Sequence, residues 1–424
     1  MEISKRSKRW IVIILLSMGL FVLLQYLFGQ SFGLGLFLLI GVGFGLLESR
    51  AEVGIATGYT GFFIKGSRIG LFGPLILFGL GAFGATIIHS LAAAEGAVPA
   101  FQASSMDAVI PGTTAVTPVN FGLVLGSFLF GVGLTINEGC GLGTLRNIGL
   151  GKFHYGVTFL FLLIGTIPGQ LVKYHLDQST IHDYEVQMYL PSQLGYFGTI
   201  LLITILILIL VAASRKYEKI RRKKNTYIKE DVSDVPVTTE EEKDRLHLGR
   251  VFKELVQSQS ARALSIAMIT LFFFLALIYT GEHLAVTAPL SNVAVGFFQL
   301  FGFTFEHPAF ADSVETVNNG LLSDTSTVQN FGIIIGAIFF AMLESKKPFA
   351  WSMKWKESGW QMISGLLMGF GAVLASGCIV GALYSGIVNL SLSGWVVFAS
   401  MSVGIVLTVN LLRGRVSTIP TSNE

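Results

Sequence analysis

Apolar runs of membrane-spanning length recur along almost the whole chain and determine its fold class. A helix that crosses about 30 Å of hydrocarbon needs roughly 20 apolar residues. About ten segments meet this condition or come close to it, at 11–29, 32–47, 69–92, 119–137, 154–173, 196–213, 263–281, 329–343, 360–377 and 393–412. The composition agrees, because 52% of the 424 residues are hydrophobic and only 13% are charged. The sequence therefore predicts an all-α polytopic membrane protein.

The basic residues predict the orientation of these segments. The stretches 93–118, 174–195 and 282–328, which the ten-segment arrangement places outside the cell, contain no Lys or Arg. Every Lys and Arg except Lys173, which lies at the end of a segment, falls on the inner side. Cytoplasmic loops of membrane proteins carry such an excess of basic residues. We therefore expect a multi-pass protein of the cell (inner) membrane with both termini cytoplasmic, and the net charge of +3 gives no support for nucleic-acid binding.

One long polar stretch divides the chain. It predicts an N-terminal membrane half (1–214), a charged cytoplasmic linker (215–261), a C-terminal membrane half (262–412) and a cytoplasmic tail (413–424). Within the linker a basic block precedes an acidic one, which is typical of a solvated segment or of contact with anionic lipid head groups. A docking site for a cytoplasmic partner is the alternative.

The only two cysteines occupy equivalent positions in an internal repeat. The segment "LFGVGLTINEGCGLGTL" (129–145) aligns without a gap to "LMGFGAVLASGCIVGAL" (367–383), and the alignment pairs Cys140 with Cys378. These motifs end the fourth and ninth segments, which cross the membrane in opposite directions. Inverted repeats are common in secondary transporters, whose substrate sites lie near the membrane midplane on broken helices. The repeat predicts two inverted-topology halves with broken or re-entrant helices at the Gly-Cys motifs.

The motif residues are the candidates for a substrate path. Glycines allow the backbone to turn and helices to approach closely, and exposed amides at a helix amino terminus favour anions. Two small buried packing residues, or a structural disulfide, are the alternatives for the cysteines. The candidate residues are Cys140, Cys378, Gly139, Gly141, Gly143, Gly377, Gly381, Glu138 and Arg146.

The roles of two charged residues near Cys140, Glu138 and Arg146, allow more than one interpretation. Arg146 either draws anions toward the inner mouth of a path or serves only as a positively charged membrane anchor. Glu138 is a proton partner, a partner of Arg146 or a solvated acid at a helix end. The similar segments "LLESR" (46–50) and "MLESK" (342–346) do not fit the inverted repeat, and we interpret them as chance or as shared interfacial anchors.

Both motifs resemble a known family. The segments "FLFGVGLTINEGCGLGTLRNIGLGKF" (128–153) and "GLLMGFGAVLASGCIVGALYSGIVNLSLSGW" (365–395) are similar to the paired Gly-Cys signatures of the YeeE/YedE membrane proteins, which take up thiosulfate and are sometimes linked to other sulfur or selenium compounds. The resemblance implies an hourglass-shaped inner-membrane protein in which thiosulfate passes a narrow centre by hydrogen bonding with Cys140 and Cys378. It also implies a small cytoplasmic sulfur-carrier protein of the sulfurtransferase type as acceptor.

The resemblance is incomplete at one point. Members of this family commonly have a third cysteine in an early cytoplasmic-side loop, but the corresponding stretch 49–70 has none. Thr57, Tyr59 and Thr60 are polar residues in this stretch.

The chemistry of a thiol suits a transport path for an anion. A neutral S–H is a weak donor, and a site on a conduction path must bind weakly enough to release its ligand. A thiolate would repel a dianion, so we expect both thiols to be protonated. Together with this chemistry, the resemblance implies an inner-membrane permease that imports thiosulfate through a central pore with two facing cysteine thiols. The alternatives are a transporter of selenium or another sulfur species, or a membrane sulfurtransferase using a cysteine persulfide.

The sequence gives little support for catalysis. A persulfide mechanism needs a lowered thiol pKa, and no basic residue lies between 357 and 412 around Cys378. There is no Walker loop, no G-x-S-x-G elbow and no H-x-x-H spacing. We therefore predict no enzyme, no cofactor and no metal site, with a small anion and membrane lipids as partners.

Overall fold

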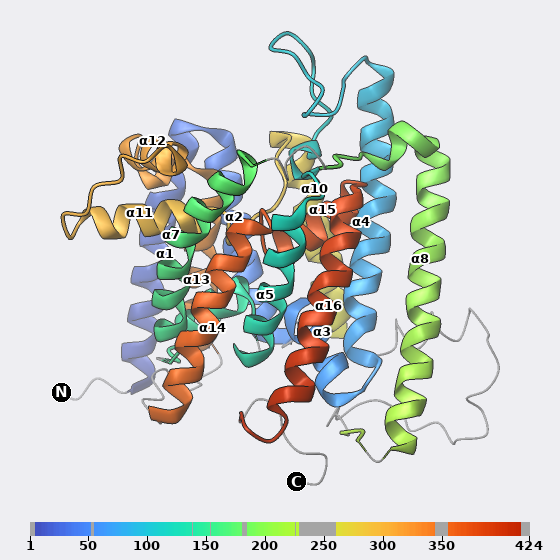
Figure 1. The fold of residues 1–424 in the computed structure, drawn as a ribbon. Coiled ribbons are helices and arrows are strands. Elements are labelled where there is room, and N and C mark those ends of the chain that lie inside the picture. Colours follow the sequence, from blue (N-terminus) through green and yellow to red (C-terminus); the bar gives the residue numbers. More distant parts are fainter. Residues whose placement is uncertain are drawn as a thin grey trace.

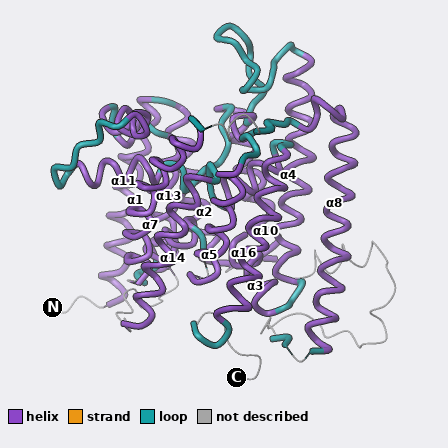
Figure 2. Tube along the Cα trace, in the orientation of Figure 1, coloured by secondary structure: helices purple, strands orange, loops and turns teal. Residues whose placement is uncertain are grey.

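The computed structural model describes residues 5–51, 55–137, 139–152, 154–179, 185–224, 226–228, 260–343 and 355–416. Helices joined by loops form this part of the chain, and isolated bridges take the place of strands within it (Figures 1 and 2). An apolar chain in lipid must satisfy its backbone hydrogen bonds internally, which a helix does within one segment. The all-α prediction is confirmed.

The helices coincide with the predicted membrane segments. Among the described residues, nine helical segments are long and apolar enough to cross a membrane, and a shorter apolar run, Leu264–Thr280, lies at the tenth predicted position. The corresponding helices are α1 (Lys5–Gln30), α2 (Phe32–Ala51), α4 (Ile69–Ala94), α5 (Phe121–Asn137) with α6 (Gly141–Gly149), α7 (His154–Asp177), α8 (Leu190–Lys223), α10 (Ser260–Thr280), α13 (Thr325–Leu343), α14 (Trp355–Leu374) and α16 (Leu392–Leu412).

Shorter elements complete the described fold. They are α3 (Ile55–Lys65), α11 (Leu290–Gln299), α12 (Ala311–Asn318), the π-helix η6 (Ile379–Tyr384), α15 (Ser385–Val388) and the 3-10 helices η1 (Thr113–Ala115), η4 (Pro308–Phe310) and η5 (Leu321–Ser323). In Figure 1, α11 and α12 lie at the upper edge of the bundle, and α11 runs across the direction of the long helices. We call this upper edge the far edge.

Helices from the two predicted halves pack closely against each other through glycines. A methyl group added to Gly45 of α2 would lie 2.2 Å from the carbonyl oxygen of Ile333 in α13, and one added to Gly336 would lie 2.2 Å from that of Val42. Similarly, α14 approaches α7, where a methyl group on Gly369 would lie 2.0 Å from the carbonyl oxygen of Leu162. Membrane helices associate through such small-residue contacts. The halves therefore interlock in the described part of the chain.

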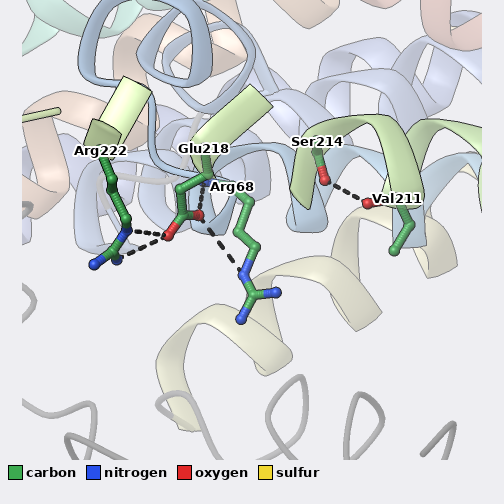
Figure 3. Close-up of polar contacts among 5 residues, drawn as sticks. All are labelled: Arg68, Val211, Ser214, Glu218 and Arg222. Atoms are coloured by element: carbon green, nitrogen blue, oxygen red, sulfur yellow. Dashed lines mark hydrogen bonds and ion pairs between the residues drawn. The ribbon is translucent and has the colours of Figure 1, made fainter. Parts of the chain in front are cut away.

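A cluster of charged residues ties α8 to the turn before α4 (Figure 3). The Glu218 carboxylate pairs with Arg222 at 2.8 Å and accepts a hydrogen bond of 3.1 Å from the backbone N–H of Arg68. In addition, Arg221 donates to the carbonyl oxygen of Ile64 at 2.7 Å. We call this end of the bundle the basic edge. α8 continues to Lys223, so the start of the predicted linker 215–261 is helical.

The chain begins and ends its described helices on one side. Figure 1 places the start of α1 and the end of α16 at the lower edge, where α8 also ends. Since α8 ends in the charged cluster of Figure 3, this is the basic edge. The helices thus alternate between the basic edge and the far edge.

Candidate functional site

Both cysteine motifs interrupt a helix. α5 ends at Asn137 and α6 begins at Gly141, with Cys140 in an extended conformation (φ −85°, ψ −170°) immediately before α6. In the second motif α14 ends at Leu374, and Cys378 (φ −104°, ψ −160°) immediately precedes η6. The Cys378 sulfur accepts a hydrogen bond from the backbone N–H of Val380 at 3.4 Å. Each thiol therefore lies at the amino end of a new helical element.

Local interactions hold the two breaks open. The Asn137 side chain donates to the carbonyl oxygen of Gly139 at 2.9 Å and to the Thr144 hydroxyl at 3.2 Å, and so bridges the end of α5 to α6. In the second motif Ser376 and Gly377 both have positive φ, 55° and 150°. A side chain at Gly377 would also lie 2.7 Å from the backbone nitrogen of Ala382. The second break therefore requires glycine at this position.

The two thiols lie close together in the core. Cys140 and Cys378 are 2% and 0% exposed, belong to the same buried cluster and are both free. Cys378 and the carboxyl group of Glu48 are near enough to interact electrostatically with the Cys140 thiol. The structure thus brings the paired motifs together without a disulfide between them.

A small cavity lies beside Cys140. Its polar lining consists of Glu48, Thr57, Cys140, Arg146 and Asn147, and its apolar lining includes Ile379 and Val380, the residues directly after Cys378. The cavity thus contains groups from α2, α3, α6 and η6. A helix break followed by a π-helix, as at Cys378, is frequently found at functional sites.

The charged groups of the cavity are incompletely paired. Arg146 is 9% exposed and donates to the carbonyl oxygen of Glu48 at 3.0 Å and to the side chain of Asn147 at 3.4 Å. Its Nε and the Oε1 of Glu48 are buried, and neither has a hydrogen-bond partner among the described residues. An unpaired buried polar atom is costly unless water or a ligand satisfies it. Both groups are therefore suited to contact a polar occupant of the cavity.

The remaining predicted site residues, which are the motif glycines and Glu138, differ in their position relative to the cavity. Gly139 and Gly143 line the cavity, and a side chain at Gly143 would meet no atom within 4 Å. A methyl group on Gly141 would lie 2.5 Å from the Thr287 side chain, and one on Gly381 would lie 3.8 Å from Ala285. Gly377 forms the turn before Cys378. Glu138 lies outside the described residues.

The residues that contact Gly141 and Gly381 belong to a buried non-helical segment, Leu284–Thr287. The Leu284 carbonyl accepts a hydrogen bond from the Ser385 hydroxyl at 2.9 Å, and the Val286 carbonyl accepts one from the Asn330 side chain at 2.7 Å. This segment was not among the predicted site residues. Its signal was a short apolar run directly after a membrane segment and just before Pro289.

Two polar residues of the cavity, Glu48 and Thr57, were not among the predicted site residues. Glu48 belongs to "LLESR", which we interpreted as chance or as an anchor, although an acid at the end of an apolar segment is a functional candidate. Thr57 was noted only as a residue of the stretch that lacks the third family cysteine. The structure places Thr57 in the same cavity as Cys140.

Comparison with known proteins identifies the family. A family model described as sulphur transport matches residues 50–407 of the 424, a range that includes both cysteine motifs, Thr57 and Arg146. Glu48 lies just before the matched range. A search of curated proteins found no match. Since the family model covers most of the chain, this multi-pass membrane protein belongs to the YeeE/YedE family of sulphur transport proteins.

Proposed function

We propose that the protein is an inner-membrane permease that imports thiosulfate along a path through Cys378, Cys140 and the adjoining cavity. Membership of a sulphur transport family and the set of membrane-length helices support transport of a sulfur compound. The observation that carries the choice of path is the meeting of two thiols, from two interrupted helices, beside a cavity lined by Arg146.

The chemistry of the lining fits a divalent sulfur anion. Arg146 supplies a permanent positive charge, and Cys140 immediately precedes α6, whose first backbone amides favour an anion. Protonated thiols add weak donors that hold the anion only briefly. An ion would thus exchange part of its hydration shell for a short series of weak donors, while Arg146 compensates its charge.

The proposed direction of transport follows from the charge distribution. The basic edge contains Arg68, Arg221 and Arg222, and basic residues accumulate on the cytoplasmic side of membrane proteins. We therefore place the basic edge and both termini in the cytoplasm, with anionic lipid head groups beside the arginines. Thiosulfate then enters from the far edge. The buried segment Leu284–Thr287 lies against both cysteine motifs, and we infer that it shifts when an ion passes.

The imported sulfur requires an acceptor. We propose a small cytoplasmic sulfur-carrier protein that receives it at the basic edge, as the family resemblance implies. Selenium compounds or other sulfur species are the alternative cargo for the same path. A persulfide on either cysteine, as in a sulfurtransferase, is the alternative chemistry, and the cysteine variants below distinguish it from a path of donors.

The test is uptake of radiolabelled thiosulfate by sulfur-starved cells that lack their own importers. We expect uptake with the wild type and its loss in Cys140→Ala and in Cys378→Ala, because each removes one donor from the path. Ser127→Ala is a matched control, since Ser127 is buried on α5 but bonds only to the backbone of its own helix.

Three results would contradict the proposal or one of its alternatives. Unchanged uptake in either alanine variant would exclude that thiol from the path. Full uptake by Cys140→Ser and Cys378→Ser would exclude a persulfide mechanism and any need for sulfur itself, and would leave only a path of donors, because serine retains a hydroxyl donor but not sulfur. A wild type that is present in the membrane but takes up no thiosulfate would make selenium compounds or sulfite the next substrates to test.

A further inference from the structure

Lys173 is an exception to the charge distribution of this protein. It lies near the end of α7 toward the far edge, and the stretches predicted to face outside contain no other Lys or Arg. Positive charges on this side oppose the usual orientation signal. A charged residue at the end of a membrane helix that opposes this signal calls for a chemical reason.

The Lys173 side chain reaches the second cysteine motif. Its Nζ donates to the Ser376 hydroxyl at 2.9 Å, although 203 positions separate the two residues in the chain. Ser376 is two residues before Cys378 and has φ 55°, a conformation uncommon for residues other than glycine. The sequence has no basic residue close to Cys378. In the structure Lys173 of α7 brings one to the second cysteine motif.

The pair retains unused donors. An ammonium group has three N–H donors, and within the described part of the chain Lys173 uses one of them, for Ser376. Because the Ser376 oxygen accepts this bond, its own hydroxyl hydrogen remains available. Asp177, one helical turn further on, interacts electrostatically with Lys173, but no ion pair joins these two residues. Lys173 therefore offers a positive charge with two open donors beside a hydroxyl.

We propose that Lys173 and Ser376 form an outer anion-binding site, which captures thiosulfate or a similar divalent sulfur oxyanion before it reaches Cys378. Charged hydrogen bonds to an oxyanion are stronger than neutral ones. The outer stretches carry acidic residues such as Asp177 but no other Lys or Arg, so an anion on this side is attracted at Lys173 and repelled by its acidic surroundings. The inference rests on the proposed transport function, because it supplies the entry site of the same path.

The test separates charge from hydrogen bonding. Lys173→Gln retains a donor for Ser376 but removes the charge, whereas Lys173→Arg retains both. We expect the KM for thiosulfate uptake to rise about tenfold in Lys173→Gln with Vmax nearly unchanged, and to stay near the wild-type value in Lys173→Arg. The wild-type KM should increase with ionic strength, because salt screens the attraction, and Lys173→Gln should lose this dependence.

Two further variants check the electrostatic reason. Asp177→Asn removes the nearest negative charge on the same helix, so its KM should fall about twofold. Lys216→Gln removes an exposed lysine of α8 and should leave KM and its salt dependence unchanged. An unaltered KM in Lys173→Gln, or a loss in Vmax alone, would overturn the inference and assign the lysine to holding the turn.

A binding measurement keeps this inference separate from the transport proposal. Labelled thiosulfate is equilibrated with the purified full-length protein in detergent, as wild type, Lys173→Gln and Cys140→Ala. The inference predicts binding that is about tenfold weaker in Lys173→Gln but retained in Cys140→Ala. Equal binding by wild type and Lys173→Gln would refute the outer site even if uptake requires both cysteines. Charge-dependent binding without any uptake would refute the transport proposal alone.

Discussion

Glu48 is an acidic residue in the lining of the cavity. We propose that a dianion, thiosulfate, passes through this cavity. The Glu48 side chain is 3% exposed, and Oε1 has no partner among the described residues. Arg146 holds the backbone carbonyl of Glu48 rather than its carboxylate. When ionised, this carboxylate repels an entering anion, and when protonated it offers a donor instead. Its protonation therefore changes how strongly the cavity holds thiosulfate.

We expect uptake by the wild type to increase as the pH falls, because thiosulfate stays doubly charged while protonation neutralises Glu48. Glu48→Gln removes the negative charge permanently. The KM of this variant at neutral pH should fall roughly fivefold, since one charge interaction in a partly hydrated site contributes about 1 kcal/mol or more. Its uptake should also vary less with pH. Initial rates of labelled uptake from mildly acidic to mildly alkaline pH measure both effects.

Asp107 provides a matched control for this experiment. It is an exposed loop residue, and hydrogen bonds from Ser104 lower the pKa of its carboxyl group. It therefore stays ionised over the tested range, and Asp107→Asn should leave the pH profile unchanged. A Glu48→Gln profile that parallels the wild type would show that the pH response arises elsewhere.

Individual site residues were predictable only where a sequence motif marked them. The paired cysteines, Gly143 and Arg146 followed from the repeat and its neighbours, and these residues lie at the cavity or beside it. Glu48, an acid at the end of an apolar run, and Lys173, the exception to the charge distribution, stand out in the sequence, but neither signal names the partner of the residue. They reach the motifs because α2 and α7 pack against distant parts of the chain, as the 203 positions between Lys173 and Ser376 illustrate.

At the scale of elements, the first turn of α6 contains two glycines with different surroundings, Gly141 and Gly143. A methyl group on Gly143 enters open space in the cavity, whereas one on Gly141 lies 2.5 Å from the Thr287 side chain. Gly143→Ala should therefore narrow the path and leave the fold intact. Gly141→Ala should instead displace the Leu284–Thr287 segment and destabilise the protein, because overpacking costs about 1–3 kcal/mol.

The two variants are compared by uptake and by thermal unfolding in detergent. We expect uptake by Gly143→Ala to be about tenfold slower at an unchanged Tm, since each 1.36 kcal/mol of added barrier slows passage about tenfold. Gly141→Ala should lower the Tm. Gly156→Ala, on α7, is the control, because its added methyl group also meets no atom within 4 Å but lies away from the cavity lining. Normal uptake by Gly143→Ala would place the path elsewhere.

Hydropathy predicted the long helices but not the short elements that build the site. A segment that crosses lipid must be apolar over roughly 20 residues, which is readable from sequence. By contrast, α3 has 11 residues and η6 has 6. They are surrounded by protein, so their conformation depends on neighbours from other helices. The Leu284–Thr287 segment is similar, because Ser385 and Asn330 hold its backbone.

At the scale of the whole molecule, the two predicted halves form one interlocked bundle. α2 packs against α13, and α14 packs against both α5 and α7, through glycines that allow backbone contact. The cysteine motifs meet inside this bundle. Each predicted half therefore supplies one thiol to the core. A single path past both thiols would need both motifs.

The orientation of this bundle decides the direction of transport. The stretches predicted to face outside lack Lys and Arg, whereas the basic edge contains Arg68, Arg221 and Arg222. Moving this edge across the membrane would oppose the positive-inside rule at several residues at once. In the proposed orientation Lys173 is the only Lys or Arg on the outer side, which is the arrangement that the outer anion site requires.

This orientation predicts the outcome of labelling with a membrane-impermeant maleimide. Ser105, in the loop after α4, and Lys224, at the end of α8, are both exposed and lie at opposite ends of the bundle. In a Cys140→Ser, Cys378→Ser background, a cysteine at position 105 should be labelled in intact cells. A cysteine at position 224 should be labelled only after the membrane is opened, because the proposed orientation places its side of the bundle in the cytoplasm. The reverse pattern would invert the bundle, place Lys173 at the cytoplasmic side and so contradict its role as an outer anion site.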